Sequence, residues 1–118
     1  MRHLEDKLHE EVWRVLRYAL PADAVAVSHE NRQNGAREGA RRKKRGCLPG
    51  WPDVQILYRG RSILIELKSQ RGSLSPAQRE MHERIEGAGG DVAVCRTVDG
   101  VLAYLRCCGV PLRAEVMA

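Results

Sequence analysis

The sequence predicts an α/β domain in which helices flank both faces of a central mixed β-sheet. Three observations lead to this fold class: an apolar pattern of helical period opens the chain, two β-rich runs flank a tight turn, and a helix separates the second run from a later strand. Strands joined by a tight turn pair antiparallel, whereas strands that flank a helix usually pair in parallel. The predicted order of elements is α-β-ββ-α-β-α.

The size and composition of the chain favour a single globular domain over residues 1–118. Of the 118 residues, 43% are hydrophobic and 30% are charged, which suits one modest core. No apolar run approaches the roughly 20 residues that a membrane span needs, and the first residues are too charged for a secretory signal. We therefore expect no membrane association and a cytoplasmic location.

An amphipathic helix is predicted over residues 2–20. Its expected core face consists of Leu4, Leu8, Val12, Val15, Leu16 and Ala19. Glu5 falls inside this apolar arc, where a charge is out of place. The acidic preference of a first helical turn explains Glu5 as well as a functional role does, and Glu10 and Glu11 remain alternative functional carboxylates.

The remaining elements follow from local signals. Ile63, Leu64 and Ile65 are consecutive apolar residues and predict a central strand that is buried on both faces. Ser75 and Pro76 predict a helix start. The expected elements are a short buried strand at 24–27, a connector at 30–50 with a short helix at 36–45, strands at 53–58 and 62–68, a helix at 75–88, a strand at 91–95 and a helix that begins at Thr97 or Asp99.

The positive charge of the chain is concentrated in the connector. The net charge is +5, whereas the segment from Arg32 to Arg45 alone carries seven basic residues and one acid. Such a segment suits a nucleic acid, although a solvated charge run is the simpler explanation. The candidate DNA-binding residues are Arg37, Arg41, Arg42, Lys43, Lys44 and Arg45.

Two carboxylates and a lysine are predicted to share one face of the sheet. Glu66 and Lys68 are two residues apart at the end of an apolar strand, so the pleat directs them to the same side. Asp53 faces Lys68 if the hairpin loop is Gly60-Arg61, and it faces Glu66 if the loop is Arg59-Gly60. Two close carboxylates favour Mg²⁺ or Mn²⁺, and the lysine suits an attacking water or a phosphoryl charge. A structural ion pair is the alternative.

These residues carry a resemblance to known nucleases. Pro52-Asp53 and Glu66-Leu67-Lys68 match the P-D…E-x-K signature of restriction-endonuclease-like enzymes. More narrowly, the chain resembles the VRR-NUC family of virus-type replication-repair nucleases over nearly its whole length. The segments that carry this resemblance, in order, are Gly50-Trp51-Pro52-Asp53, Ile65-Glu66-Leu67-Lys68, Leu74-Ser75-Pro76-Ala77-Gln78 and Gly89-Gly90-Asp91-Val92-Ala93-Val94.

The resemblance implies a restriction-endonuclease-like α/β/α fold and a metal-dependent phosphodiesterase. Asp53, Glu66 and the backbone carbonyl of Leu67 would hold Mg²⁺ or Mn²⁺, and Lys68 would contact the attacking water.

Two further residues acquire roles from the resemblance. Glu5 would be the additional acid from the first helix, a second catalytic and metal-ligating candidate. Gln78 matches the glutamine of the family's Leu-Ser-Pro-x-Gln segment and would face the catalytic site, a role compatible with a capping box shared with Ser75.

The function implied by the resemblance is that of a DNA endonuclease in replication, repair or recombination. Stand-alone members are associated with homodimers that act on branched DNA such as four-way (Holliday) junctions. Two alternatives remain open: a non-catalytic nucleic-acid-binding module of the same fold, and a monomeric nuclease that trims or nicks DNA ends.

Overall fold

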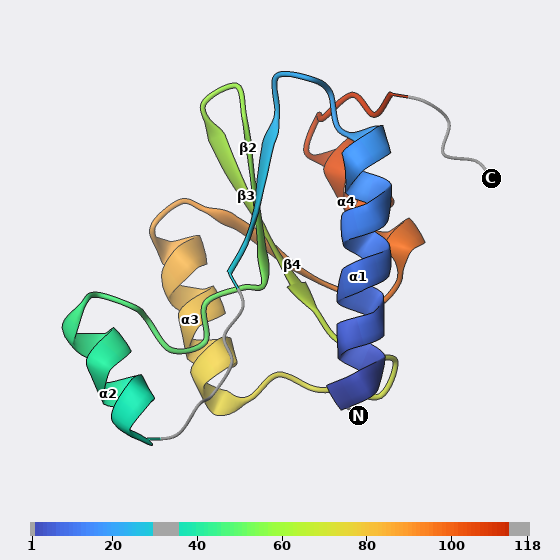
Figure 1. The fold of residues 1–118 in the computed structure, drawn as a ribbon. Helices are drawn as coiled ribbons and strands as arrows, with labels where there is room; N and C mark the ends of the chain where they lie inside the picture. Colours follow the sequence, from blue (N-terminus) through green and yellow to red (C-terminus); the bar gives the residue numbers. More distant parts are fainter. Residues whose placement is uncertain (1, 30–35, 114–118) are drawn as a thin grey trace.

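A four-stranded mixed sheet forms the centre of the molecule (Figure 1). The structure, a computed structural model, describes residues 2–29 and 36–113, and it describes side chains over 4–29 and 40–113. The strands lie in the order β1-β2-β3-β4. Their bounds are β1 (Val25–Ser28), β2 (Val54–Tyr58), β3 (Arg61–Leu67) and β4 (Asp91–Cys95).

The pairing of these strands confirms the predicted mixed topology. β1 pairs antiparallel with β2, β2 pairs antiparallel with β3, and β3 pairs in parallel with β4. β3 therefore has a neighbour on each side, as its unbroken apolar run predicts. Ile63 and Ile65 have no exposed surface and Leu64 is 3% exposed, so a charged residue at the end of this strand enters a dry environment.

A two-residue turn at Arg59-Gly60 sets the register of the hairpin. Both residues have positive φ, 49° for Arg59 and 80° for Gly60, the backbone of the tight turn whose twist matches that of its strands. Val54 pairs with Ile65. The next position along the ladder therefore sets Asp53 opposite Glu66, which resolves the two registers left open by the sequence.

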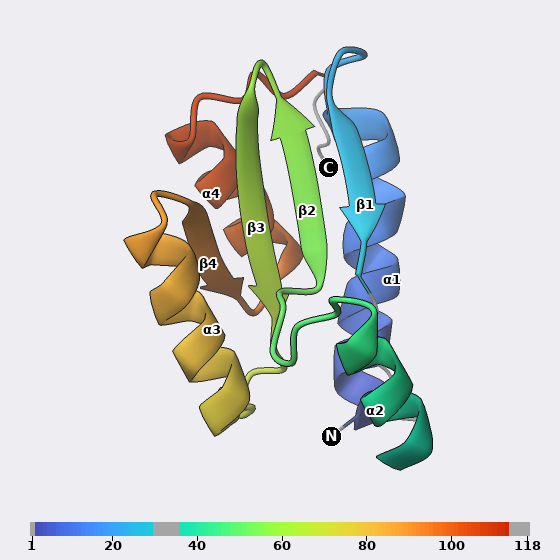
Figure 2. The same ribbon diagram turned by 90° about the vertical axis from the view of Figure 1, so that its left-hand side faces the viewer.

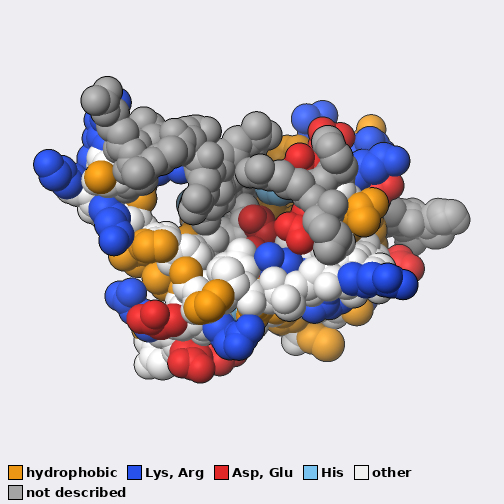
Figure 3. All heavy atoms as spheres, turned by 90° about the horizontal axis from the view of Figure 1, so that it is seen from below, with side chains coloured by type: hydrophobic (Ala, Val, Ile, Leu, Met, Phe, Trp, Pro, Cys, Tyr) orange, Lys and Arg blue, Asp and Glu red, His pale blue; other side chains and the backbone are white. Residues whose placement is uncertain are grey.

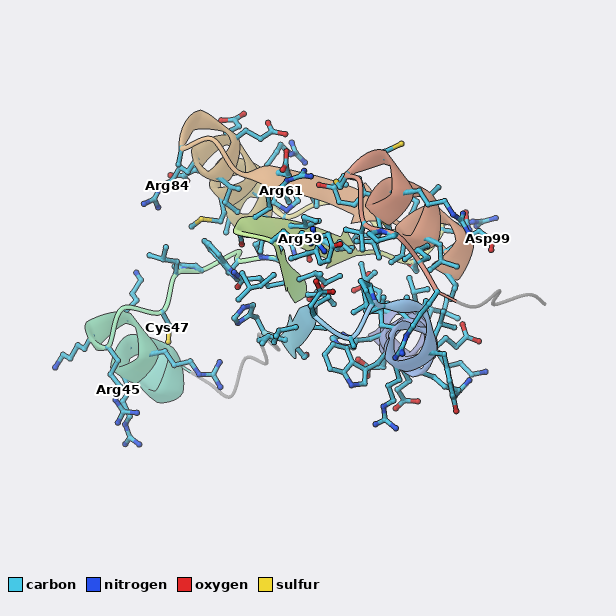
Figure 4. All side chains as sticks on the ribbon, turned by 90° about the horizontal axis from the view of Figure 1, so that it is seen from above. Arg45, Cys47, Arg59, Arg61, Arg84 and Asp99 are labelled. Atoms are coloured by element: carbon cyan, nitrogen blue, oxygen red, sulfur yellow. The ribbon has the colours of Figure 1, made fainter. Side chains whose placement is uncertain are left out.

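Helices cover both faces of the sheet (Figure 4). On one face lie α1 (Arg2–Ala19) and α4 (Val98–Cys107), and on the other lies α3 (Pro76–Gly87). The connector contains α2 (Ala36–Lys44), one residue shorter than predicted. Figure 4 shows α2 standing to one side of the sheet, and its described side chains, those of residues 40–44, are exposed except for the half-buried Arg42.

The core is divided into two parts by the sheet. The larger part lies between the sheet and α1 and α4, and the smaller part consists of Leu64, Met81 and Ile85 beneath α3. β3 contributes to both, because alternate side chains of a strand point to opposite faces. Within the described residues, no helix combines the length and the apolar character needed to cross a membrane.

The predicted burial of Leu4 and of the strand at 24–27 is wrong. Leu4 is 57% exposed, because the first turn of α1 extends beyond the end of the sheet (Figure 2). Val25 and Val27, on the strand predicted to be buried, are 55% and 39% exposed. β1 is an edge strand, and α3 covers only the β3–β4 side of its face, so the β1–β2 side stays open (Figure 2).

We predict that Gly50→Ala displaces the start of α3. Gly50 has a φ of +81°, and a Cβ added there would lie 2.4 Å from the carbonyl oxygen of Ala77 and 2.9 Å from the backbone nitrogen of Gln78. Gly46→Ala is the matched control, because Gly46 has a similar φ of +92° but open space around it. The control is expected to cost about 1–2 kcal/mol of unfolding free energy from backbone strain alone.

Gly50→Ala is expected to cost about 3 kcal/mol or more, since a backbone clash adds to the strain. Urea unfolding of both variants measures the difference. Equal losses for the two variants would contradict the close packing of this loop against α3.

Candidate active site

The end of β3 brings two carboxylates together. Asp53 directly precedes β2, and its Oδ2 atom accepts a hydrogen bond from the backbone nitrogen of Leu67 at 2.8 Å. Glu66 lies opposite Asp53 and is only 1% exposed. The structure thus places Asp53, Glu66 and Leu67 at one point of the sheet. Lys68 follows directly, held in place by a bond from its backbone nitrogen to the carbonyl of Cys95 at 3.1 Å.

Two side chains of α3 contact the Glu66 carboxyl group. Gln78 Nε2 donates to Oε2 of Glu66 at 3.2 Å, and His82 Nε2 lies 3.1 Å from Oε1. Gln78 also forms the predicted capping box, in which its backbone nitrogen donates to the Ser75 hydroxyl and its Oε1 accepts from the Ser75 nitrogen. The two roles weighed for Gln78 are therefore combined in one side chain.

His82 is a site residue that the sequence analysis missed. Its position four residues after Gln78 was the available signal, because residues at this spacing share one face of a helix. Burial lowers the pKa of His82. Burial thus favours the neutral imidazole, which forms a hydrogen bond with the Glu66 carboxyl group.

The pKa of Glu66 is raised to about 9. Burial is the largest cause, followed by the hydrogen bond to Asp53 and the negative charge of Asp53. The positive charge of Lys68 opposes these effects, and Glu5 adds to them. Without a cation, Glu66 therefore retains a proton at neutral pH.

Glu5 of α1 approaches the same site. A Cβ added at Gly72 would lie 2.9 Å from Oε2 of Glu5 and 3.5 Å from Cδ of Lys68. A side chain at position 72 would displace the carboxylate end of Glu5 or the Ser69 hydroxyl, which lies 3.1 Å from the same point. Glu10 and Glu11 are exposed on α1, so Glu5 is the acid of this helix that the structure places beside Lys68.

The loop after Lys68 is held by Arg96, which sequence reasoning also missed. The Nη1 atom of Arg96 donates to the carbonyls of Ser69 and Gly72, both at 2.6 Å. Arg96 directly follows β4, so the strand that pairs with β3 also anchors the loop facing Glu5. No sequence pattern marks a guanidinium that binds backbone carbonyls in this way.

The surface over the site is hollowed. Seen from the end of the molecule where β3 finishes, acidic side chains lie in a central hollow with a basic side chain beside them (Figure 3). Among the described side chains, no three of His, Cys, Asp and Glu form a ready metal cluster. The carboxylates that act on Glu66 are Asp53 and Glu5, and carboxylate oxygens are donors of the kind that hard cations prefer.

The basic residues of the connector lie apart from the carboxylates. Arg41, Lys43, Lys44 and Arg45 are exposed and Arg42 is half-buried, whereas the Arg37 side chain is outside the described ones. Arg45 lies on the α2 side, beyond the edge of the sheet (Figure 4). α2 nevertheless occupies the same end of the molecule as the start of α3 (Figures 1 and 2).

Comparisons with known proteins point to one family. The sequence model of the VRR-NUC domain matches residues 1–99. A solved structure described as a VRR_NUC domain protein superposes with a TM-score of 0.61 at 22% identity, covering 87% of this chain and 85% of the other. A second, described as a VRR_NUC domain, has a TM-score of 0.56 at 20% identity, covering 87% and 95%. No curated protein matches the chain.

We predict that the stability of the cation-free protein falls as pH rises from about 4.5 to about 9. The folded state keeps the Glu66 proton over this range because its pKa is raised to about 9, whereas the unfolded chain loses the proton near the ordinary value of 4.5. Raising the pH through this window therefore favours unfolding, with a slope of at most about 1.4 kcal/mol per pH unit for one proton.

Urea unfolding in EDTA at several pH values measures this slope, and Glu66→Gln is expected to remove it. The amide keeps the size of the side chain and does not titrate. If wild type and Glu66→Gln show the same pH dependence, the buried carboxyl group is not the cause.

Proposed function

Because this chain belongs to the VRR-NUC domain family, we propose that it is a metal-dependent endonuclease that hydrolyses phosphodiester bonds of DNA. One observation carries the proposal: a fully buried Glu66 lies opposite Asp53 and next to Lys68 at the end of the central strand. A carboxylate at such a position is costly unless a positive charge compensates it. A bound cation would compensate the charge of Glu66 and would also allow the site to catalyse hydrolysis.

The donor set of the site suits Mg²⁺ or Mn²⁺. Asp53 and Glu66 would hold the ion together with the backbone carbonyl of Leu67, and Glu5 would contribute through water or directly. Such oxygen ligands without Cys or His fit these hard ions rather than zinc. When bound, the ion supplies a more acidic water and stabilises charge on the phosphoryl oxygens.

The residues of the chain have separate tasks in this proposal. Lys68 orients the attacking water and stabilises the negative charge that develops on the phosphoryl group. Gln78 holds the Glu66 carboxylate through the bond to Oε2. Arg96 holds the loop that follows Lys68 near Glu5. Lys68 and Glu5 therefore stay on the same side of the site.

We further propose that the substrate is branched DNA and that the protein acts as a homodimer. A two-fold dimer presents two active sites and two basic helices to two strands, which suits a four-way junction. Val25 and its ladder partner Leu57 are 55% and 46% exposed on the open face of the sheet, beside the exposed Val27. A contiguous apolar surface of this kind supports association with another protein surface.

The non-catalytic alternative fits the structure less well. A module that only binds nucleic acid needs the basic connector but gains nothing from a protonated glutamate enclosed by Asp53, Gln78 and His82. Cleavage of DNA ends by a monomer uses the same site and is separated from the proposal by its substrate.

We predict that Asp53→Asn, Glu66→Gln and Lys68→Ala each reduce DNA cleavage by about 100-fold or more. The first two substitutions remove a carboxylate that would bind the metal ion, and the third removes the ammonium group. None of them opens a large cavity. The measurement uses labelled linear, flapped and four-way-junction DNA in Mg²⁺ and in Mn²⁺. The junction is expected to receive paired nicks in opposite strands, as two linked active sites would produce.

DNA affinity is the control, because α2 rather than the carboxylates is expected to supply it. It should stay close to wild type in all three variants. Full turnover by Glu66→Gln would end the nuclease proposal, and preferential cleavage at linear ends would favour the monomeric alternative.

We predict that neutralising the basic end of the connector weakens binding to every DNA sequence alike. Replacing Arg41, Arg42, Lys43, Lys44 and Arg45 together by Gln is expected to shallow the slope of log K against log[salt] by about 0.9 for each phosphate that the protein no longer binds. Affinities for a junction and a linear duplex at several salt concentrations measure this slope.

Arg84→Gln with Arg106→Gln is the matched control, since these cations lie in the last turns of α3 and α4. The control pair should leave the slope unchanged. If the connector variant keeps the wild-type slope, its charge run is only a solvated surface.

A further inference from the structure

His82 occupies a position in α3 where packing alone calls for an apolar residue. Its neighbour Met81 and the following Ile85 are 4% and 7% exposed and pack with Leu64 beneath the helix. The His82 side chain is 11% exposed and lies within the same layer. Its Nε2 atom is directed to Oε1 of Glu66 at 3.1 Å.

Gln78 and His82 contact different oxygens of the Glu66 carboxyl group. Oε2 of Glu66 accepts from Gln78 and Oε1 faces His82. The amide of Gln78 cannot turn over freely, because its Oε1 accepts from the backbone nitrogen of Ser75 at 2.9 Å. One end of the carboxyl group is thus fixed through the helix cap, and the imidazole fixes the other end.

Each oxygen of an ionised carboxylate accepts more than one bond. Gln78, and His82 in the tautomer that carries its proton on Nε2, therefore leave lone pairs free on the side shared with Asp53. Gln78 and the imidazole of His82 therefore orient Glu66 from the side of α3.

We infer that His82 is a positioning residue that holds Glu66 in the orientation required to bind the catalytic cation. The inference rests on the proposed function, since it assumes that Glu66 is a metal ligand. Groups that bond to metal ligands orient them before the metal arrives, and removing them typically weakens metal affinity by about 10–100-fold. His82 is expected to act on metal affinity more than on the rate of the loaded enzyme.

The test compares His82→Leu with His82→Gln in the full chain. Leucine keeps an apolar volume but removes the donor, whereas glutamine carries an N–H at the same distance along the side chain as Nε2. Calorimetric titration with Mn²⁺ alone is expected to show weaker binding by His82→Leu, by about 10–100-fold, and near-wild-type binding by His82→Gln. In cleavage assays, His82→Leu should need more Mn²⁺ for half-maximal rate while retaining most of the rate at saturation.

Ile85→Val is the matched control for reduced packing in α3, since Ile85 lies one turn after Met81 and contacts the same apolar cluster. It should lower the melting temperature without changing Mn²⁺ affinity. Wild-type affinity in His82→Leu, or equally weak binding by His82→Leu and His82→Gln, would overturn the inference while leaving the proposed function intact. Failure of the wild-type protein to bind Mn²⁺ would instead contradict the proposed function itself.

Discussion

The rest of the structure depends on the burial of one carboxyl group, that of Glu66 at the end of the central strand. Taking an ionised carboxylate out of water costs several kcal/mol after relaxation, unless other groups compensate it. The chain supplies such groups from separate elements: Lys68 follows β3, and Gln78 and His82 belong to α3. Asp53, directly before β2, has the opposite effect and favours the protonated form of Glu66. β2, β3 and α3 also contribute residues to the core, so the packing of these elements also brings the partners of Glu66 together.

Two features of the backbone position the partners of Glu66. The left-handed turn at Arg59-Gly60 fixes the hairpin register, and a slip of one residue would turn Asp53 to the face opposite Glu66. Gly50 lets the chain approach within contact distance of Ala77 at the start of α3, which brings the helix cap and Gln78 to the carboxyl group. A side chain at position 50 or a three-residue hairpin loop would separate the same partners.

The parts of this arrangement that follow from local chemistry could be predicted from the sequence. The apolar run of β3 identifies the central strand, the pleat places Glu66 with Lys68, and Ser75 with Gln78 marks the start of α3. Exposure of Leu4 and Val25 could not be predicted, because it depends on how far α1 overhangs the sheet and which strands α3 covers. The roles of His82 and Arg96 could not be predicted for a related reason. Each residue contacts a partner that is distant in the chain, and neither belongs to a local pattern.

The separation of the carboxylates from α2 has a physical advantage under the proposed function. A cluster of cations placed directly against Asp53 and Glu66 would lower the need for a metal ion and compete with it for the same oxygens. α2 instead stands beyond the edge of the sheet (Figure 4). In the proposed function, its charges would act on the phosphates of a long polyanion, which reaches both regions at once, while the carboxylates would bind a small divalent ion. Substrate attraction and metal binding would then use opposite charges without cancelling each other.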